Sequence, residues 1–377
     1  MAAFDGTFPA TFVVPDRVKK GAIVRAGCEL DTDLVDTLDA GTELVIAEAG
    51  KNKKGTVRYR LTKPVEGWVS DKSVEWVAPP EPEPVDPETD QEAFMAQSPL
   101  CSAGAVLFKV SGGVGVVTLN QPENNNALSA AIFIGLLRCV KYAYEHVGSL
   151  RVVFVKSSGR IWCAGGDPKD FQKAQAMVAA GGAGEPEDND KGAHEFAGRL
   201  KYINECPVPL IGLVAGPVFG GGVGIASVFD MVVCTERAVF QLSEVKLGVI
   251  PATISPYVVQ AMGVRASRRF FITGEPMPAA ICKDIGFVSE VVKDVRALEE
   301  AAQKICDNFT LAAPKAVAAS KALVQGVAFK VITDDVISYT ADQLAKIRVD
   351  TEAVDGMVAL LAKKRPPWAA DPLKVKL

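Results

Sequence analysis

The stretch GPVFGGGVGIASVFD, residues 216–230, decides the fold. Three consecutive glycines, 220–222, are followed by Gly224, so the backbone there carries almost no side chains. One interpretation is a dinucleotide fold, because Gly222-Val-Gly224 begins a G-x-G-x-x pattern and an acidic residue, Glu244, follows about 20 residues on. The third glycine of that fingerprint is Ser227, however, which makes the match weak. A second interpretation is tight helix packing. A third is a helix that starts at the glycines and directs free N–H groups at an anion.

A second turn of small residues supports the anion-binding interpretation. In GRIWCAGGDPKDF, residues 159–171, a predicted strand ends at a turn formed by residues 164–166, and a helix is expected to start at Asp167-Pro168. Asp is a favourable N-cap residue and Pro is favourable at the first helical position. Two such turns predict that one N–H from each reaches the same oxygen atom.

The overall composition indicates a folded protein with reduced thiols and excludes several classes of function. The 377 residues carry a net charge of −4, with 49% apolar and 23% charged residues, so nucleic-acid binding is not favoured. No secretory signal and no apolar run of the length of a membrane span, ~18 residues, is found. The eight cysteines are scattered singly, and with only two histidines a metal site is not expected. We expect a cytoplasmic protein.

The clearest domain boundary is an acidic, proline-rich linker at residues 78–98. Its first part, APPEPEPVDPETDQEA, has five prolines and six acidic residues and no basic one, a composition that cannot bury apolar surface. Residues 1–77 show short alternating stretches separated by glycine-rich turns and are predicted to form a small SH3-like β-barrel. Residues 99–377 alternate strand and helix patterns, which predicts an α/β domain with a helical C-terminal section.

The quoted motifs, together with FQLSEVKLGVIPATISPYVV at residues 240–259, resemble the crotonase (enoyl-CoA hydratase/isomerase) superfamily. The resemblance covers roughly residues 103–369 and implies an α/β spiral of ββα turns whose C-terminal helices build trimers or hexamers. It implies acyl thioester substrates. It also implies an oxyanion hole for the thioester carbonyl, formed by the N–H groups of Ala164 and Gly221.

The same resemblance identifies the acid/base group. Hydratases of this superfamily usually carry two glutamates; here the first position is Gly224 and the second is Glu244. A single carboxylate can serve either a dehydration or a double-bond isomerisation, and an inactive scaffold is a third alternative. Glycine at the first position is similar to the 3-hydroxy-3-methylglutaryl thioester dehydratases of polyketide β-branching and to bacterial 3-methylglutaconyl-CoA hydratases. Hydrolases of the superfamily pair their glutamate with an aspartate, and the matching residue here is Ala252.

Further candidate residues concern the binding of the substrate. Residues 126–128 match a family motif on the pantetheine and adenine side, while Lys169 and Lys246 are candidates for contact with a distal carboxylate. Glu123 and Asn124 replace basic residues, so the thioester is carried on coenzyme A or on an acyl carrier protein. No metal and no other cofactor is expected. The predicted substrate-binding residues are Asn126, Ala127, Leu128, Gly165, Asp167, Lys169 and Gly220.

Overall fold

The computed structural model describes residues 104–167, 186–369 and 371–377, together with seven strands in the N-terminal region. The chain divides into two compact units, Met1–Glu83 and Pro84–Leu377. In the described part, no helix is long and apolar enough to cross a membrane.

The N-terminal unit contains one seven-stranded sheet with the order β3-β2-β6-β5-β4-β1-β7. Its paired strands are antiparallel, as expected of short strands joined by turns. Most other residues of this region, including the linker at 78–98, lie outside the described residues, so the SH3-like barrel and the linker stay predictions. The strands are β1 (Ala10–Val13), β2 (Ala22–Arg25), β3 (Leu34–Leu38), β4 (Glu43–Lys51), β5 (Val57–Lys63), β6 (Gly67–Ser70) and β7 (Glu75–Trp76).

The second unit is built on a six-stranded sheet with the order β16-β13-β11-β10-β9-β8. Strands β8 and β9 form an antiparallel hairpin, and every other neighbouring pair is parallel, which is the α/β class that the sequence predicts. A smaller three-stranded sheet has the order β12-β14-β15. The strands of both sheets are β8 (Val106–Ser111), β9 (Val114–Leu119), β10 (Val152–Ser157), β11 (Leu210–Val214), β12 (Val218–Phe219), β13 (Met231–Thr235), β14 (Val239–Gln241), β15 (Met277–Pro278) and β16 (Glu290–Val292).

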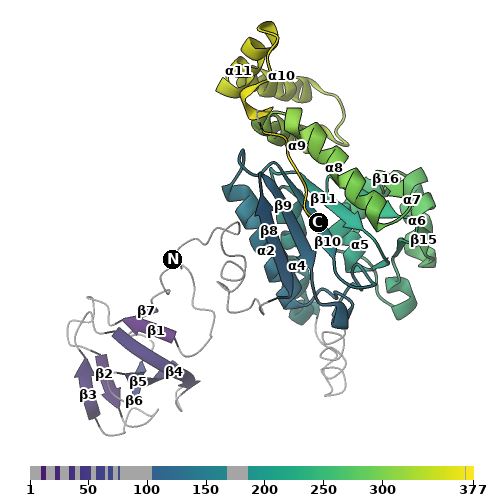
Figure 1. Ribbon diagram of the computed structural model, residues 1–377. Coiled ribbons are helices and arrows are strands. Elements are labelled where there is room, and N and C mark those ends of the chain that lie inside the picture. The colour runs from purple at the N-terminus through teal and green to yellow at the C-terminus, as the bar shows by residue number, and fades with distance from the viewer. Residues whose placement is uncertain are drawn as a thin grey trace. The chain divides into compact units, whose positions relative to one another are not determined.

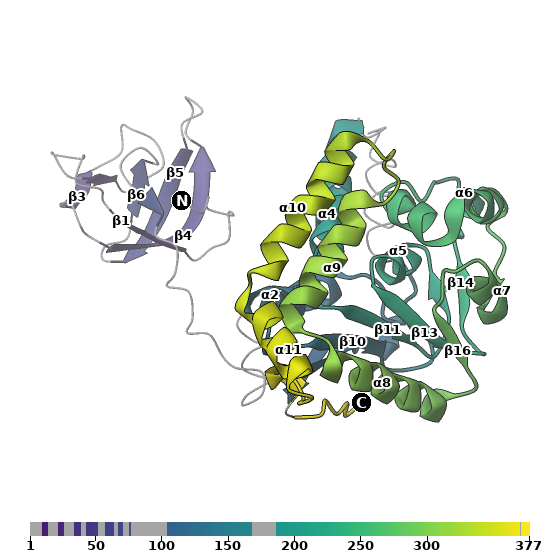
Figure 2. The same ribbon diagram turned by 90° about the horizontal axis from the view of Figure 1, so that it is seen from above.

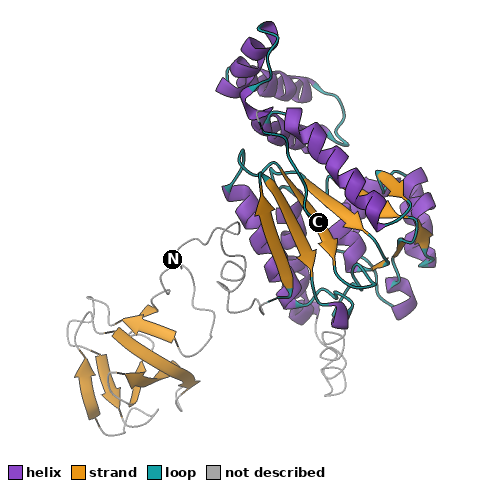
Figure 3. Ribbon diagram, viewed as in Figure 1, coloured by secondary structure: helices purple, strands orange, loops and turns teal. Residues whose placement is uncertain are grey.

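Helices cover both faces of the large sheet (Figure 1, Figure 3). Successive residues of β10 alternate between two buried clusters, as the two-residue period of a strand requires. Val153 and Val155 belong to the cluster that contains α2 (Ala130–Glu145), whereas Val152 and Phe154 belong to the cluster that contains α8 (Val295–Leu311). Figure 2 shows α8 on one side of this sheet and α2 and α5 on the other. The six cysteines of the described part are free and buried.

The helices and short 3₁₀ turns complete this unit. The buried Arg151, directly before β10, donates hydrogen bonds to the carbonyl oxygens of Phe309 (2.7 Å) and Trp368 (3.0 Å). These bonds hold the C-terminal segments against the sheet. The elements are η2 (Pro122–Asn124), α2 (Ala130–Glu145), α4 (Pro186–Asn204), α5 (Gly221–Ser227), η3 (Glu244–Leu247), α6 (Ser255–Thr273), α7 (Ala279–Asp284), α8 (Val295–Leu311), α9 (Pro314–Val327), α10 (Asp334–Arg348), α11 (Thr351–Leu361) and η4 (Pro367–Ala369).

The last three helices, α9 to α11, contain no buried residue, and α10 and α11 extend beyond the sheet in Figure 1. They nevertheless carry large apolar side chains that are more than half exposed, including Ile337, Val358 and Leu361. Lys321 of α9 anchors this section, because its Nζ lies 2.8 Å from Oδ2 of Asp230, the residue just before β13. The predicted helical C-terminal section is therefore present, with an apolar surface that the described residues of the second unit leave exposed.

Candidate active site

Short parallel pairings bring the two glycine turns and the predicted carboxylate to one place. Cys163 forms a parallel bridge with Val218, and β12 pairs in parallel with β14. Each of these three segments then runs on into a turn, so the turns come to lie side by side. The N–H of Gly220 donates to the carbonyl oxygen of Gln241 at 2.9 Å, which joins the glycine run to the segment before Glu244.

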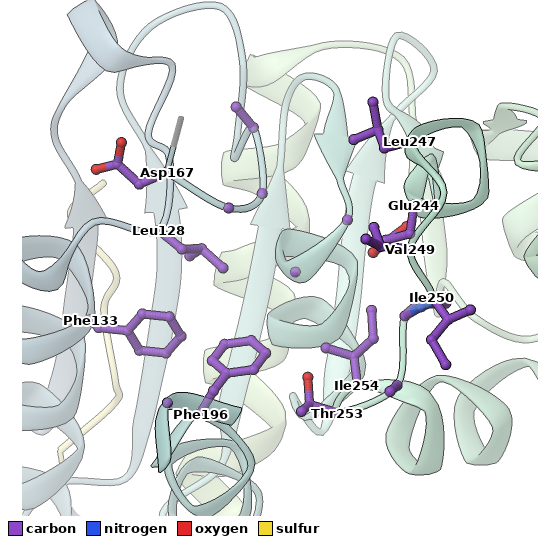
Figure 4. A pocket seen from close by; sticks show the side chains of 18 of the residues that line it. Leu128, Phe133, Asp167, Phe196, Glu244, Leu247, Val249, Ile250, Thr253 and Ile254 are labelled. Atoms are coloured by element: carbon purple, nitrogen blue, oxygen red, sulfur yellow. The ribbon is translucent and has the colours of Figure 1, made fainter. Parts of the chain in front are cut away.

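These turns line a pocket of about 510 Å³. Helices α2 and α4 and the loop after η3 complete its wall, and Figure 4 shows Phe133 and Phe196 across the pocket from Glu244. Its lining residues are Leu128, Ala130, Phe133, Ala164, Gly165, Gly166, Asp167, Gly192, Glu195, Phe196, Arg199, Gly220, Gly221, Ser243, Glu244, Leu247, Val249, Ile250, Pro251, Ala252, Thr253 and Ile254.

Glu244 is half-buried at the start of η3, and its carboxylate faces the pocket. Its Oε2 is buried and has no hydrogen-bond partner within the described part of the chain. Burial raises the pKa of this carboxyl above its ordinary value, and the backbone N–H of Glu244 itself offsets only part of that rise. A carboxyl group whose pKa is raised in this way is suited to accept and return a proton.

Gly220 and Gly221 need to be glycine for two different reasons. Gly220 has φ 48° and ψ −121°, a conformation that L-residues avoid, and a Cβ on it would lie 3.2 Å from Oε1 of Glu244. A Cβ on Gly221 would lie 2.8 Å from Cδ1 of Leu128. The N–H of Gly221 opens α5 and has no intrahelical acceptor, because it belongs to the first turn. A hydrogen-bond donor and the carboxylate of Glu244 thus line one pocket.

The prediction for the second N–H donor was wrong at Ala164. Ala164 lines the pocket, but its N–H donates to the carbonyl oxygen of Asn125 at 3.0 Å and is therefore occupied. Gly166, two residues later, is exposed and lines the same pocket. Leu128 pairs with Gly166 in a parallel bridge, in which the N–H of Leu128 donates to the carbonyl oxygen of Gly165 at 2.7 Å. In that pattern the N–H of Gly166 points away from Leu128.

Gly165 provides the turn between these two residues. Its φ of 85° favours glycine, and a Cβ there would lie 2.8 Å from the carbonyl oxygen of Phe219. The predicted pair of small-residue turns is therefore present, and the two segments are in close contact. The sequence motif alone did not distinguish which of three adjacent N–H groups remains unbonded.

Ile254 occupies the place of the missing first glutamate. Gly224 is buried in α5, and a Cβ on it would lie 2.1 Å from Cγ2 of Ile254. Real Cβ atoms do not make contacts this short, so no side chain fits at this position while Ile254 keeps its place. Position 224 therefore has no room for a glutamate beside Ile254.

The predicted binding motif at residues 126–128 contributes only one of its three members to the pocket. The side-chain amide of Asn126 is fully buried and donates to the carbonyl oxygens of Ser158 (2.8 Å) and Ile161 (2.9 Å), while its Oδ1 accepts from the N–H of Gln121 (2.8 Å). Asn126 therefore holds the loop together and leaves no amide group for a substrate. Ala127 is buried and does not line the pocket, whereas Leu128 does.

The charged residues of the pocket match the prediction for its carboxylates but not for its cation. Asp167 lines it, buried, across from Glu244 (Figure 4). Lys169 lies outside the described residues, and Lys246 is exposed and does not line the pocket. The cation that does line it is Arg199 of α4, which sequence patterns did not single out, because no motif indicates that α4 covers the pocket.

No group of three or more His, Cys, Asp or Glu side chains suited to a metal ion occurs within residues 104–167 and 186–377.

Comparison with known proteins identifies a family for this chain. A family model described as enoyl-CoA hydratase/isomerase matches residues 109–371. A putative enoyl-CoA hydratase of Thermus thermophilus is 28% identical over 256 residues, 68% of this chain and 97% of that protein. An enoyl-CoA hydratase of Alternaria alternata is 30% identical over 212 residues, 55% of this chain, and the chain spans only 65% of that relative's length.

The solved structures agree with the sequence comparisons. The crystal structure of an enoyl-CoA hydratase from Shewanella pealeana superposes with a TM-score of 0.67 and 30% identity, and it covers 74% of this chain and 100% of its own. This match confirms the predicted α/β fold with its C-terminal helices. Since the family model matches more than half of the sequence, and the pocket contains the glycine turns and the glutamate that the motifs predict, the chain belongs to the enoyl-CoA hydratase/isomerase family.

Proposed function

We propose that this protein is a hydro-lyase that dehydrates a 3-hydroxyacyl thioester, or hydrates the matching enoyl thioester. The observation that carries the proposal is the buried Oε2 of Glu244, which shares a pocket with the N–H at the start of α5; neither has a hydrogen-bond partner among the described residues. One group can move a proton and the other can stabilise the anion that results. Family membership supports acyl thioesters as the substrate class.

In the proposed reaction the thioester carbonyl oxygen accepts hydrogen bonds from the N–H groups of Gly221 and Gly166. The carboxylate of Glu244 takes a proton from C2, and the electron pair moves onto the carbonyl oxygen to give an enolate. Each such donor is typically worth ~3–4 kcal/mol of transition-state stabilisation. These two donors replace the pair of Ala164 and Gly221 that the motif predicted.

Glu244, now protonated, returns its proton to the hydroxyl group leaving C3. Water departs as the enolate collapses, and a double bond forms between C2 and C3. The same carboxylate thus serves as base and then as acid on one face of the substrate, a syn elimination. Its raised pKa suits both roles, because a carboxyl titrating closer to neutral pH accepts and releases a proton with less cost.

For the acyl group we propose 3-hydroxy-3-methylglutaryl, the substrate of the dehydratases that the motif around Gly224 and Glu244 resembles. Ile254 against Gly224 supports a mechanism with one glutamate in place of two. Ala252, which lines the pocket where related hydrolases carry an aspartate, supports elimination over thioester hydrolysis. The carrier is coenzyme A or the phosphopantetheine of an acyl carrier protein.

A second candidate function is double-bond isomerisation, because a lone glutamate can also carry a proton from C2 to C4. The two reactions are separated by incubating the protein with a panel of 3-hydroxyacyl and 3-enoyl thioesters and weighing the products by mass spectrometry. Loss or gain of water supports the hydro-lyase. An unchanged mass with a moved double bond supports the isomerase, and no reaction with any thioester supports an inactive scaffold.

We also propose that the catalytic unit assembles as a trimer or a hexamer. The exposed apolar side chains of α9 to α11 support this, because a helix surface of this kind is unfavourable in water unless a partner covers it. Residues 1–77 are proposed to be a separate docking module on the linker at 78–98, since all pocket residues come from the second unit.

A further inference from the structure

Arg199 is the only cation that lines the pocket among the described residues. The other charged residues of this lining are the carboxylates Asp167, Glu195 and Glu244. A second carboxylate on the acyl group would therefore meet like charge at each of these side chains and opposite charge only at Arg199. This distribution fixes where such a group is able to bind.

Two contacts hold the Arg199 guanidinium in position. Its Nη2 lies 3.2 Å from Oε2 of Glu195, one helical turn earlier in α4. Its centre lies 5.5 Å from the ring centroid of Phe133, a cation–π geometry. Phe133 in turn packs perpendicular to Phe196, with ring centroids 5.2 Å apart. The charge is thus presented from an aromatic wall that lies across the pocket from Glu244 (Figure 4).

The ion pair with Glu195 leaves Arg199 able to bind another anion. A guanidinium carries five N–H donors, and the pair uses Nη2. Both side chains are partly exposed, 35% for Arg199 and 50% for Glu195, and ion pairs of this kind are weak. A substrate carboxylate can therefore share the guanidinium or displace Glu195, whereas a neutral acyl group gains nothing from it.

We propose that Arg199 is the specificity-determining residue that binds the distal carboxylate of a dicarboxylic acyl thioester; this inference rests on the proposed function. Glu195 holds the guanidinium in place in the free protein and competes with the substrate for it. Of the two lysines that the sequence offered for this task, Lys246 does not line the pocket and Lys169 lies outside the described residues.

The test compares 3-hydroxy-3-methylglutaryl-CoA with the same thioester whose distal carboxylate is replaced by a primary amide. The readout is the ratio of kcat/KM for the acid to kcat/KM for the amide. Arg199→Gln is expected to lower this ratio by about 10- to 100-fold, the range for losing a charge-assisted hydrogen bond. Arg199→Lys, which keeps the charge but not the planar fork, is expected to give an intermediate ratio. Glu195→Gln removes the competing carboxylate and is expected to raise the ratio.

The matched control is Lys201→Gln, also on α4. Lys201 is exposed, its Nζ lies 3.7 Å from Oε1 of Glu205, and it does not line the pocket. An unchanged ratio in Arg199→Gln overturns the inference, and so does an equal fall in Lys201→Gln, which would indicate a general charge effect. If the wild-type protein dehydrates neither thioester, the proposed function fails. Arg199 is then still tested by the ratio of the two dissociation constants, which Arg199→Gln is expected to change in the same direction.

Discussion

Replacing Gly224 by alanine tests whether Ile254 closes the position of the missing glutamate. The new Cβ would lie 2.1 Å from Cγ2 and 2.7 Å from Cβ of Ile254. Carbon atoms in contact prefer roughly 3.5–4 Å, so the two residues would have to separate by about 1.5 Å. Ile254 is 2% exposed and β-branched, and its side chain has little freedom to move aside.

The expected cost follows from these distances. Overpacking of a core typically costs about 1–3 kcal/mol, and a clash this short belongs at the upper end. Alanine in place of glycine in a helix returns about 1 kcal/mol. We therefore expect Gly224→Ala to lower the free energy of unfolding by about 2 kcal/mol. Gly198→Ala is the matched control, because a Cβ there meets nothing within 4 Å, and it is expected to be neutral or stabilising.

Urea unfolding of a double-mutant cycle provides the assay. Ile254→Ala alone is expected to cost about 2–5 kcal/mol through the cavity it leaves. On that background Gly224→Ala is expected to cost clearly less than in the wild-type protein, because Cγ2 is gone and only the contact with Cβ, at 2.7 Å, remains. If Gly224→Ala stabilises the wild-type protein, or lowers the free energy of unfolding equally on both backgrounds, Ile254 does not close the space beside Gly224. By the same geometry, Gly224→Glu is not expected to increase dehydration.

Three further predictions concern the pH profile, the ion pair between Lys321 and Asp230, and the assembly. Only ionised Glu244 accepts the C2 proton, and burial raises the pKa of this carboxyl. We therefore expect kcat/KM to fall as the pH drops through a value above the ordinary glutamate pKa of about 4.3. Initial rates that fall only at or below this pH would contradict the prediction. Burial already raises the pKa of Asp230, and Lys321→Met removes the cation that pairs with its carboxylate. We therefore expect the free energy of unfolding to fall by about 3 kcal/mol. The control Lys201→Met should lower it by less than about 0.5 kcal/mol. Light scattering should report a trimer or a hexamer, and a stable monomer at micromolar concentration would refute the proposed assembly.

The sequence predicted the class of fold and part of the site. Motifs singled out Glu244 and Gly221, and the structure brings both to one pocket, because a short pattern encodes the local turns that carry them; their catalytic roles stay proposals. Ala164 was wrong because the unbonded N–H depends on a contact with Asn125, about 40 residues away in the chain. Asn126 was misassigned for a similar reason, since the partners of its buried amide lie in the loop after β10.

Other features of the site depend on packing between distant elements. Nothing in the sequence near Gly224 indicates that Ile254 fills the space beside it. Arg199 is equally invisible, because its role depends on how α4 lies against Phe133 of α2. Motifs therefore locate backbone turns and the acid/base group, whereas the residues that shape the pocket around them require the three-dimensional structure.

The most direct test of the central claim, that Glu244 alone moves the proton, is the turnover of Glu244→Gln on a 3-hydroxyacyl thioester. Gln keeps the size of the side chain but cannot accept a proton, so kcat should fall by at least ~10²-fold while thioester affinity is kept. Folding should also be kept, because replacing a half-buried carboxylate whose pKa is raised removes a cost of ionisation at neutral pH. Glu244→Gln should therefore be a folded protein that binds thioester without turning it over. Turnover near the wild-type rate would contradict it and direct attention to Asp167.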